Sequence, residues 1–148
     1  AASETAYLDR TRYWTSRLAA PSANVALGKV ASASGSQGGF PPGNAVDGNA
    51  SSYWESTNNA FPQTFTVDLG AAAPVRKLVL KLPPSWGTRT QTISVDGGDP
   101  AAYVFDPANG NTVTIPVPAV SRQTVRLTFT GNTGWPAGQV SEVEAYAS

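Results

Sequence analysis

Apolar and polar residues alternate in short runs over most of the chain, a pattern that is typical of half-buried β-strands. The clearest run is residues 64–69, in which Phe65, Val67 and Leu69 alternate with polar residues until a glycine ends the run. The same alternation, or a short apolar run between turn residues, marks the other predicted strands. Strands are predicted at residues 25–31, 64–69, 75–82, 90–95, 102–105, 112–117, 123–130 and 139–146.

Segments rich in glycine, proline, serine and asparagine separate these runs. Residues 35–43 form a long segment of this kind that contains the aromatic Phe40, while residues 96–98 and 106–110 are short turns. Strands that recur at intervals of roughly 8 to 15 residues, with turns between them, favour an antiparallel sandwich over a sheet of βαβ units. We therefore expect an all-β fold, and about eight strands favour a jelly roll.

The first 23 residues follow a different pattern. Their larger side chains recur at spacings of four, three and four residues, which predicts a short helix that ends at Pro21. We interpret residues 1–23 as a helical lead-in or linker from an upstream domain, and residues 24–148 as the β-domain. We expect the apolar face of the helix to lie against the sandwich or against the upstream domain. The residues of this face are Tyr7, Thr11, Trp14 and Leu18.

Composition narrows the chemistry that the chain can perform. The 148 residues carry ten basic and ten acidic side chains, so no net field favours nucleic acid or acidic lipid. The sequence has no cysteine and no histidine, which excludes disulfides, cysteine-ligated zinc and a histidine general base. Any metal site must therefore be built from oxygen ligands. No apolar run approaches the roughly 20 residues of a membrane span, and no charged-then-apolar leader opens the sequence.

Residues 44–54 bring several oxygen-bearing side chains into one sharp turn. Asp47, Asn49 and Ser52 surround Gly48, which allows the backbone to bend. Calcium takes about six to eight oxygen ligands from carboxylates, carbonyls and hydroxyls, so the turn is a candidate cation site. The alternative is a polar surface turn that only precedes a strand, because such turns are common.

Five short pieces of the sequence occur in a characteristic order. They are residues 24–29 (NVALGK), 45–48 (AVDG) with Trp54 downstream, 67–70 (VDLG), 125–127 (VRL) and 142–146 (EVEAY). Together they resemble the discoidin family, also called coagulation factor type C domains, whose bacterial members include carbohydrate-binding module family 32. The resemblance implies an eight-stranded antiparallel jelly-roll β-sandwich, a galactose-binding-domain-like fold, which agrees with the fold expected from periodicity. It also implies that Trp54 belongs to the core.

Members of this family often carry one structural calcium ion beside the Asp-Gly turn, and the resemblance implies the same site here. Two formal charges and about six oxygens suit calcium better than magnesium, which keeps more waters. Serine stands at position 52 where threonine is more usual in the family, which keeps the hydroxyl on a less rigid side chain. The implied ligands are the carbonyls of Asn44, Asn49 and Ser141, the carboxylates of Asp47 and Glu142, and oxygens of Ser52.

Trp86 and Trp135 lie in segments rich in glycine and proline between predicted strands. A tryptophan on a loop offers a flat apolar face that can stack on the C–H face of a sugar ring. In the family, loops at one end of the sandwich bind the ligand, and Trp135 falls in the loop before the last strand. The alternative is that each indole plugs the end of the sandwich. Candidates for hydrogen bonds to sugar hydroxyls are Glu55, Asn58, Asn59 and Arg89.

We interpret the chain as a non-catalytic carbohydrate-binding module that targets a neutral polysaccharide, most simply a glucan. A glycosidase needs two carboxyl groups across a cleft, but Glu142 and Glu144 share one strand and Glu142 is a predicted calcium ligand. An adhesive protein- or membrane-binding discoidin module is a further alternative. Membrane binding favours apolar loops ringed by lysine and arginine, which this sequence lacks.

The sequence also leads to expectations about the setting of the module. We expect a secreted monomer that is joined to an upstream catalytic domain, in the manner of an accessory domain of a glycoside hydrolase. Structural calcium is the only cofactor expected, and neither nucleic acid nor membrane is an expected partner. One module should bind sugar weakly, at about millimolar to micromolar affinity, because each stacked ring contributes only a few kcal/mol.

Overall fold

The computed structural model describes residues 23–148, so the helix expected in the lead-in lies outside the described residues. No helix within residues 23–148 is long and apolar enough to cross a membrane. The strands are β1 (Val30–Ala33), β2 (Trp54–Glu55), β3 (Gln63–Lys81), β4 (Arg89–Val95), β5 (Ala101–Phe105), β6 (Thr112–Asn132), β7 (Gln139–Val140) and β8 (Glu142–Tyr146). Two short 3₁₀ helices, η1 (Pro42–Ala45) and η2 (Pro107–Asn109), lie in the connections.

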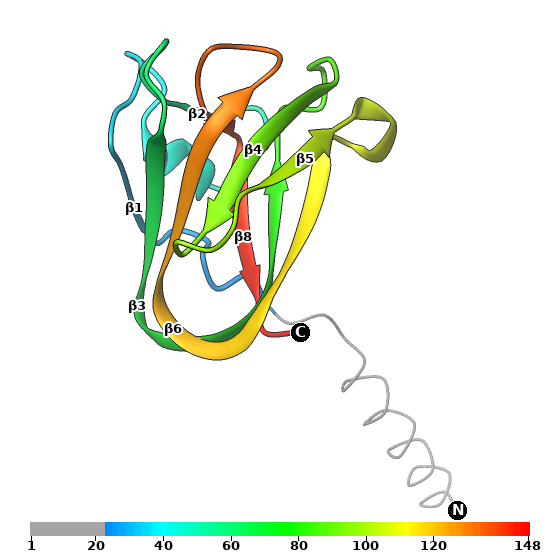
Figure 1. Ribbon diagram of the computed structural model, residues 1–148. Coiled ribbons are helices and arrows are strands. Elements are labelled where there is room, and N and C mark those ends of the chain that lie inside the picture. Colours follow the sequence, from blue (N-terminus) through cyan, green and yellow to red (C-terminus); the bar gives the residue numbers. More distant parts are fainter. Residues whose placement is uncertain (1–22) are drawn as a thin grey trace, which may run out of the picture.

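The strands form a sheet that folds over into two layers. Its order is β1-β3-β6-β4-β5, with β8 also paired to β3, while β2 and β7 form a separate pair. The long strands β3 and β6 bend together at the base of the molecule, so their halves lie in different layers (Figure 1). The first half of β3 pairs with β1 and its second half with β8, all antiparallel. The result is the jelly-roll sandwich that the sequence predicted.

Two pairs of predicted strands are continuous strands in the structure. The runs before and after Gly70 both lie in β3, and those before and after Ser121 both lie in β6. The pairing of β3 with β6 shifts register between Asp68 and Ala73, where the sandwich bends. Gly70 has a φ of 86°, which a glycine adopts without strain. Gly70 predicts the end of a strand, but β3 stays paired with β6 on both sides of the bend and continues through it.

The first predicted strand, residues 25–31, is wrong in its placement. Residues 25–28 form a turn, and β1 begins only at Val30. The turn is stabilised by Asn24, whose Oδ1 accepts hydrogen bonds from the backbone N–H groups of Ala26 and Ala145, both at 3.0 Å. An asparagine side chain that bonds the backbone two residues on favours a turn over a strand. The second bond also ties the start of the domain to β8.

The last predicted strand, residues 139–146, is divided, and β2 was not predicted at all. Ser141 separates β7 from β8, and its backbone N–H donates to Lys81 O at 2.8 Å. β2 has only two residues, which is too short for any alternation to be recognised. Its pairing with β7 comes from tertiary structure, because the partners are more than 80 residues apart, as for Trp54 and Val140.

Trp54 lies in the core, as expected. Its indole is fully buried, with ring centroids 5.3 Å from Phe65 and 5.4 Å from Phe129. Its Nε1 donates to Gly35 O at 3.1 Å, so the one polar atom of the ring is paired. Burying an aliphatic or aromatic side chain in such a core contributes about 1.5–3 kcal/mol. Alternate positions of β3, β4 and β6 supply much of the remaining core, including Val67, Leu78, Leu80, Ile93, Val125 and Leu127.

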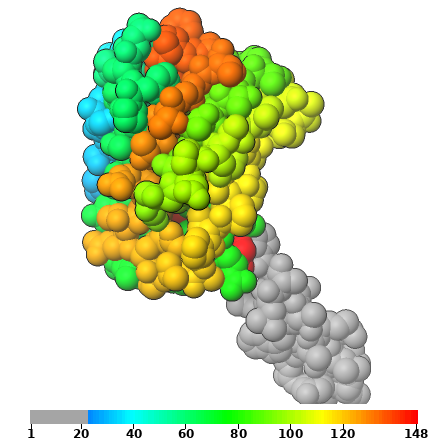
Figure 2. Space-filling view, viewed as in Figure 1, coloured from blue at the N-terminus to red at the C-terminus, as the bar shows by residue number. Residues whose placement is uncertain are grey.

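Three loops gather at the end of the sandwich opposite the bends of β3 and β6 (Figures 1 and 2). They are residues 56–62, 82–88 and 133–138. The backbone N–H of Asn59 donates to Pro136 O at 2.7 Å, which joins the first loop to the third. This end of the molecule therefore brings together segments that lie far apart in the sequence.

Candidate functional site

A pocket of about 390 Å³ lies among these loops. Two of its walls are aromatic and come from the loops before β4 and before β7. Its polar residues come from β2, from the first residue of β4 and from β7. The lining residues are Tyr53, Glu55, Trp86, Gly87, Arg89, Trp135 and Gln139.

The two tryptophans of the pocket are held in different ways. Trp135 is 47% exposed, and its Nε1 donates to Asn58 Oδ1 at 3.1 Å. Trp86 is half-buried, because it makes an edge contact with Tyr53 at 4.5 Å between ring centroids. The Arg89 guanidinium lies over the Trp86 ring, 4.6 Å from its centroid. Neither indole is sealed inside the protein, so both can meet a ligand.

The polar part of the pocket contains one carboxylate and one guanidinium, joined through an amide. Arg89 Nη1 donates to Gln139 Oε1 at 3.0 Å, and Gln139 Nε2 donates to Glu55 Oε1 at 2.8 Å. Glu55 is only 7% exposed. Burial lowers the pKa of Arg89 below its ordinary value, because desolvation penalises the charged form. The guanidinium still remains charged at any physiological pH, so the pocket carries one charge of each sign.

The structure brings together four of the six predicted sugar-binding residues: Glu55, Trp86, Arg89 and Trp135 all line the pocket. Asn58 and Asn59 lie beside it and not in its lining. Asn58 supports the Trp135 indole, and Asn59 joins two loops through its backbone. Their placement favours a supporting role over the direct contact with sugar that the sequence predicted.

Two lining residues, Tyr53 and Gln139, were not singled out from the sequence. Tyr53 follows the Asp47 turn directly, and its ring also stacks on Phe40 with centroids 4.6 Å apart. Gln139 lies in a predicted strand, and nothing in the alternation marks it as buried. The sequence around Gln139 contains no cluster of polar residues that could have pointed to it.

The six predicted metal ligands fall into two neighbouring segments. In the turn, Ser52 Oγ donates to Asp47 Oδ2, and Asn49 N donates to Asp47 Oδ1 at 2.9 Å. Burial alone would raise the pKa of Asp47, but the hydrogen bonds from Ser52 and Asn49 leave it below its ordinary value. Asp47 is therefore a fully ionised carboxylate at neutral pH.

Glu142 supplies the observation that points to a cation. It is only 3% exposed, and neither of its carboxylate oxygens has a hydrogen-bond partner within the described residues. Burial, together with the nearby carboxylate of Asp47, raises its pKa to about 8. The buried carboxylate of Glu142 faces the exposed carboxylate of Asp47, and two neighbouring carboxylates repel each other unless a proton or a cation lies between them. The donor set is all oxygen and thus fits a hard cation such as calcium.

The other predicted ligands fit a cation site less closely than Asp47 and Glu142 do. Asn49 O already accepts a hydrogen bond from Ser52 Oγ at 3.1 Å. The Asn44 side chain donates to Tyr53 O at 3.1 Å, a bond that does not involve the Asn44 carbonyl that the sequence predicted as a ligand. Ser141 Oγ is buried without a partner, so its hydroxyl is also available, whereas the sequence pointed to its carbonyl. Residues 23–148 contain no group of three or more acidic side chains placed to hold a metal ion, so hydroxyl, backbone or water oxygens would have to complete the shell.

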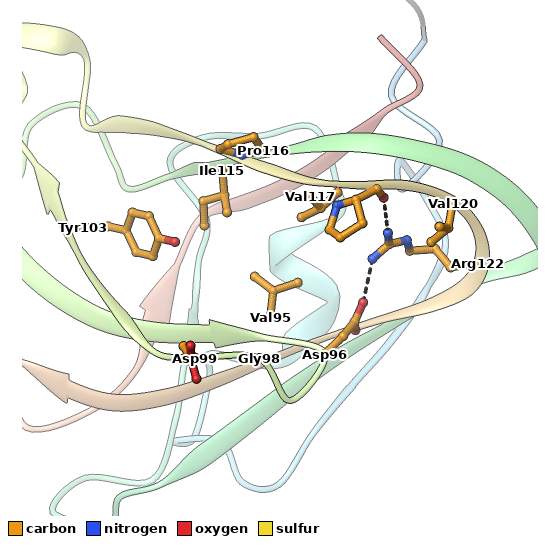
Figure 3. Close-up of a pocket in the computed structure, with 11 residues that line it drawn as sticks. Val95, Asp96, Gly98, Asp99, Tyr103, Ile115, Pro116, Val117, Val120 and Arg122 are labelled. Atoms are coloured by element: carbon orange, nitrogen blue, oxygen red, sulfur yellow. Dashed lines mark hydrogen bonds and ion pairs between the residues drawn. The ribbon is translucent and has the colours of Figure 1, made fainter.

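A larger cleft, of about 510 Å³, lies near the opposite end of β4, between β4, β5 and β6 (Figure 3). Its lining is mainly aliphatic, and Tyr103 is its only aromatic side chain. Arg122 at one end is already engaged, because its guanidinium contacts Asp96 Oδ2 at 2.7 Å and donates to Pro118 O at 2.6 Å. The smaller pocket is therefore the stronger candidate for a polar ring, since it combines two indoles with a carboxylate and a guanidinium.

The sequence profile of the F5/8 type C domain matches residues 30–143, which is more than half of the chain. The chain belongs to the F5/8 type C domain family. This confirms the discoidin resemblance on which the sequence interpretation drew. No curated protein matches the chain.

Solved structures of F5/8 type C relatives agree with this assignment. A variant of chitosan-binding module 1 from a chitosanase/glucanase of Paenibacillus sp. IK-5 is 30% identical, with a TM-score of 0.62, and the match covers 84% of this chain and 98% of that one. The module CpGH89CBM32-4 of Clostridium perfringens, in complex with GlcNAc-α-1,4-galactose, is 27% identical, with a TM-score of 0.63 and coverage of 85% and 94%.

The family 32 module of Clostridium perfringens NanJ, in complex with galactose, has the same fold, with a TM-score of 0.67 at 22% identity and coverage of 86% and 99%. These relatives are carbohydrate-binding modules. Their similarity supports a carbohydrate-binding role for this F5/8 type C domain.

Proposed function

We propose that this F5/8 type C domain is a carbohydrate-binding module whose ligand site is the pocket between Trp86 and Trp135. The observation that carries the proposal is that two accessible indoles from separate loops line one pocket together with Glu55 and Arg89. Indole faces stack on the C–H faces of sugar rings, while a carboxylate and a guanidinium bond the hydroxyls. A single site of this size binds weakly, at about millimolar to micromolar affinity.

The ligand class that suits the pocket is a neutral glycan, with a glucan as the first candidate. The charges of Glu55 and Arg89 cancel, so the pocket attracts neither acidic nor basic sugars as a whole. A glucosamine polymer is the second candidate, because Glu55 is a buried carboxylate in the lining and could accept from an ammonium group. The similarity to a chitosan-binding module at 30% identity supports this second candidate.

We infer that the domain itself performs no hydrolysis and serves as an accessory module of a secreted polysaccharide-degrading enzyme. Glycoside hydrolysis needs a second carboxyl group about 5–10 Å from the first across the substrate. Glu55 is the only acidic residue in the lining of the pocket. Weak binding by one module becomes useful when a catalytic domain on the same chain acts on the polysaccharide that the module holds.

The test is a glycan array of glucans, galactosides and chitooligosaccharides, followed by titration calorimetry with the best ligand. Trp135→Ala should weaken binding about tenfold or more, with little change in stability, because the indole is half exposed. Trp86→Ala should weaken binding and also destabilise the fold, since Tyr53 and Arg89 pack against that ring.

The matched control for these variants is Val120→Ala, which removes an apolar side chain of similar exposure, 52%, from the base of the sandwich. Its affinity should equal that of the wild type. Wild-type affinity in both tryptophan variants would remove the stacking proposal.

We also propose that a structural calcium ion joins the Asp47 turn to β8 through Asp47 and Glu142, with Ser52, Ser141, Asn44 and Asn49 supplying further oxygens. The buried, unpartnered carboxylate of Glu142 supports this proposal. The ion would neutralise the two carboxylates and fix the turn against the strand.

Calcium should raise the unfolding temperature by several degrees relative to chelator, because binding to the folded state alone stabilises it. Glu142→Gln should abolish this shift. Glu144→Gln is the matched control, since Glu144 lies on the same strand but pairs with Lys81 at 3.0 Å. A full calcium response in Glu142→Gln would contradict the proposed site.

A further inference from the structure

The two charges of the pocket are held apart by a buried glutamine. Gln139, on β7, has only 3% of its surface exposed. Its Oε1 accepts from Arg89 Nη1 at 3.0 Å, and its Nε2 donates to Glu55 Oε1 at 2.8 Å. The amide therefore lies between a cation and an anion and occupies one hydrogen-bonding position of each.

Two further amides fix the orientation of Gln139. The side chain of Gln91, fully buried on β4, bonds the Gln139 backbone twice: Nε2 donates to Gln139 O at 2.8 Å, and Oε1 accepts from Gln139 N at 2.9 Å. Asn132 Nδ2 donates to Gln139 Oε1 at 3.0 Å and to Ala137 O at 2.9 Å. Because a carbonyl only accepts and a guanidinium only donates, these partners leave one orientation for each amide.

This arrangement leaves one oxygen of the Glu55 carboxylate and one nitrogen of the Arg89 guanidinium unused. Within the described residues, Glu55 Oε2 and Arg89 Nη2 make no hydrogen bond, whereas Glu55 Oε1, Arg89 Nη1 and Arg89 Nε are engaged. Both residues line the pocket. Two adjacent sugar hydroxyls can donate to the carboxylate and accept from the guanidinium at once. An ammonium group or a carboxylate could satisfy only one of the two.

We propose that Gln139 is a positioning residue that determines the specificity of this pocket, and that the ligand it selects is an uncharged sugar unit with two adjacent hydroxyls. This inference rests on the proposed carbohydrate-binding function. Gln139 acts through Glu55 and Arg89, because its amide prevents them from pairing directly with each other. Without the amide, the carboxylate and the guanidinium would close into an ion pair, and the unused donor and acceptor would be lost to the ligand.

The test compares Gln139→Met, Gln139→Glu and wild type in titrations with a neutral oligosaccharide and its glucosamine counterpart. Gln139→Met keeps the side-chain volume but removes the amide, and it should weaken binding of the neutral sugar by about tenfold or more. Gln139→Glu keeps the acceptor for Arg89 and Asn132 but places a second carboxylate against Glu55. It should lower the ratio of neutral-sugar to amino-sugar affinity by about tenfold.

The matched control is Gln123→Met, at an exposed position of β6 far from the pocket, where the side-chain Nε2 donates to Asp68 Oδ1 at 3.3 Å. It should keep wild-type affinity and preference. If Gln139→Met does not fold, the isosteric Gln139→Glu decides the question. Folded Gln139 variants with wild-type affinity and an unchanged sugar ratio would overturn the proposal.

A measurement without sugar separates this inference from the proposed function. The side-chain Nε–Hε resonance of Arg89, observed by NMR in the ligand-free protein, should shift in Gln139→Met and stay unchanged in Gln123→Met. If the wild type binds no sugar, the proposed function fails, and the Arg89 resonance alone decides the positioning role. An unmoved Arg89 resonance in Gln139→Met would refute that role.

Discussion

Trp86 and Trp135 have the same signature in the sequence but different physical roles. Both lie between glycines and prolines, yet Trp135 is half exposed with its Nε1 bonded to Asn58, whereas Trp86 is packed between Tyr53 and Arg89. A ring that is already packed on one side loses less entropy on binding but also supports the fold. A substitution in this pocket can change both the stability of the fold and the affinity for sugar, so both quantities have to be measured for each variant.

Gly138 is constrained by steric contact with the core and not by a positive φ angle. A Cβ atom there would lie 2.8 Å from Cγ of Phe129, a ring that is fully buried. We expect Gly138→Ala to destabilise the protein by about 1–3 kcal/mol, because the core must shift to admit a methyl group. Urea unfolding measures the change.

The control for this prediction is Gly38→Ala, because a Cβ at Gly38 meets no atom within 4 Å. Its stability should stay within about 0.5 kcal/mol of the wild type. Equal stability of Gly138→Ala and Gly38→Ala would show that the loop before β7 moves away from the core at little cost.

At the scale of elements, the loop that carries Trp86 depends on the start of β6. Asn111 is fully buried with a φ of 52°, and its Nδ2 donates to the carbonyls of Pro83 and Trp86, both at 2.9 Å. Leu82 N also donates to Asn111 O at 3.0 Å. One side chain thus replaces the secondary structure that the loop lacks and sets the position of the indole.

Asn111→Ala should destabilise the protein by about 2–4 kcal/mol, from two lost hydrogen bonds and a left-handed backbone that alanine tolerates poorly. Asn111→Gly loses the same bonds but accepts the backbone angle, so it should be more stable than Asn111→Ala by about 1 kcal/mol. Urea unfolding compares the two variants, and calorimetry should show weaker sugar binding for both. Equal stabilities would mean that the positive φ adds no strain at this position.

At the scale of the whole molecule, β3 and β6 belong to both layers of the sandwich, so the layers cannot separate while these strands stay paired. The pocket lies at one end, and the proposed calcium site lies beside it, because Ser52 and Tyr53 are neighbours in the chain. Asn44 connects the two through its bond to Tyr53 O. The paired strands form a rigid scaffold that holds the irregular loops of the pocket in a fixed arrangement.

Residues 24–148 expressed alone should therefore unfold in one cooperative transition and bind sugar with the affinity of the full chain. Calorimetric and van't Hoff enthalpies of unfolding should agree for this fragment. A fragment that lacks cooperative unfolding, or that binds at least tenfold more weakly, would show that residues 1–23 complete the fold or the pocket.

Much of the fold followed from the sequence because its signals are local. Alternation placed most of β4, β5, β6 and β8, and the turn residues after β4 and before β6 were recognised at the right positions. The errors occurred where distant contacts overrule local signals. Gly70 appeared to end a strand that its neighbours continue, and Asn24 turned a predicted strand into a turn.

The sequence by itself determined the β-sandwich, the family and the two loop tryptophans, because periodicity, turn chemistry and short motifs are properties of neighbouring residues. Only the tertiary structure decided that Gln139 lies between Glu55 and Arg89, since these partners are 84 and 50 residues away along the chain. The same holds for the unpartnered carboxylate of Glu142. The burial of a polar side chain and its hydrogen-bond partners depend on which strands pack against one another. Local sequence patterns do not determine that packing.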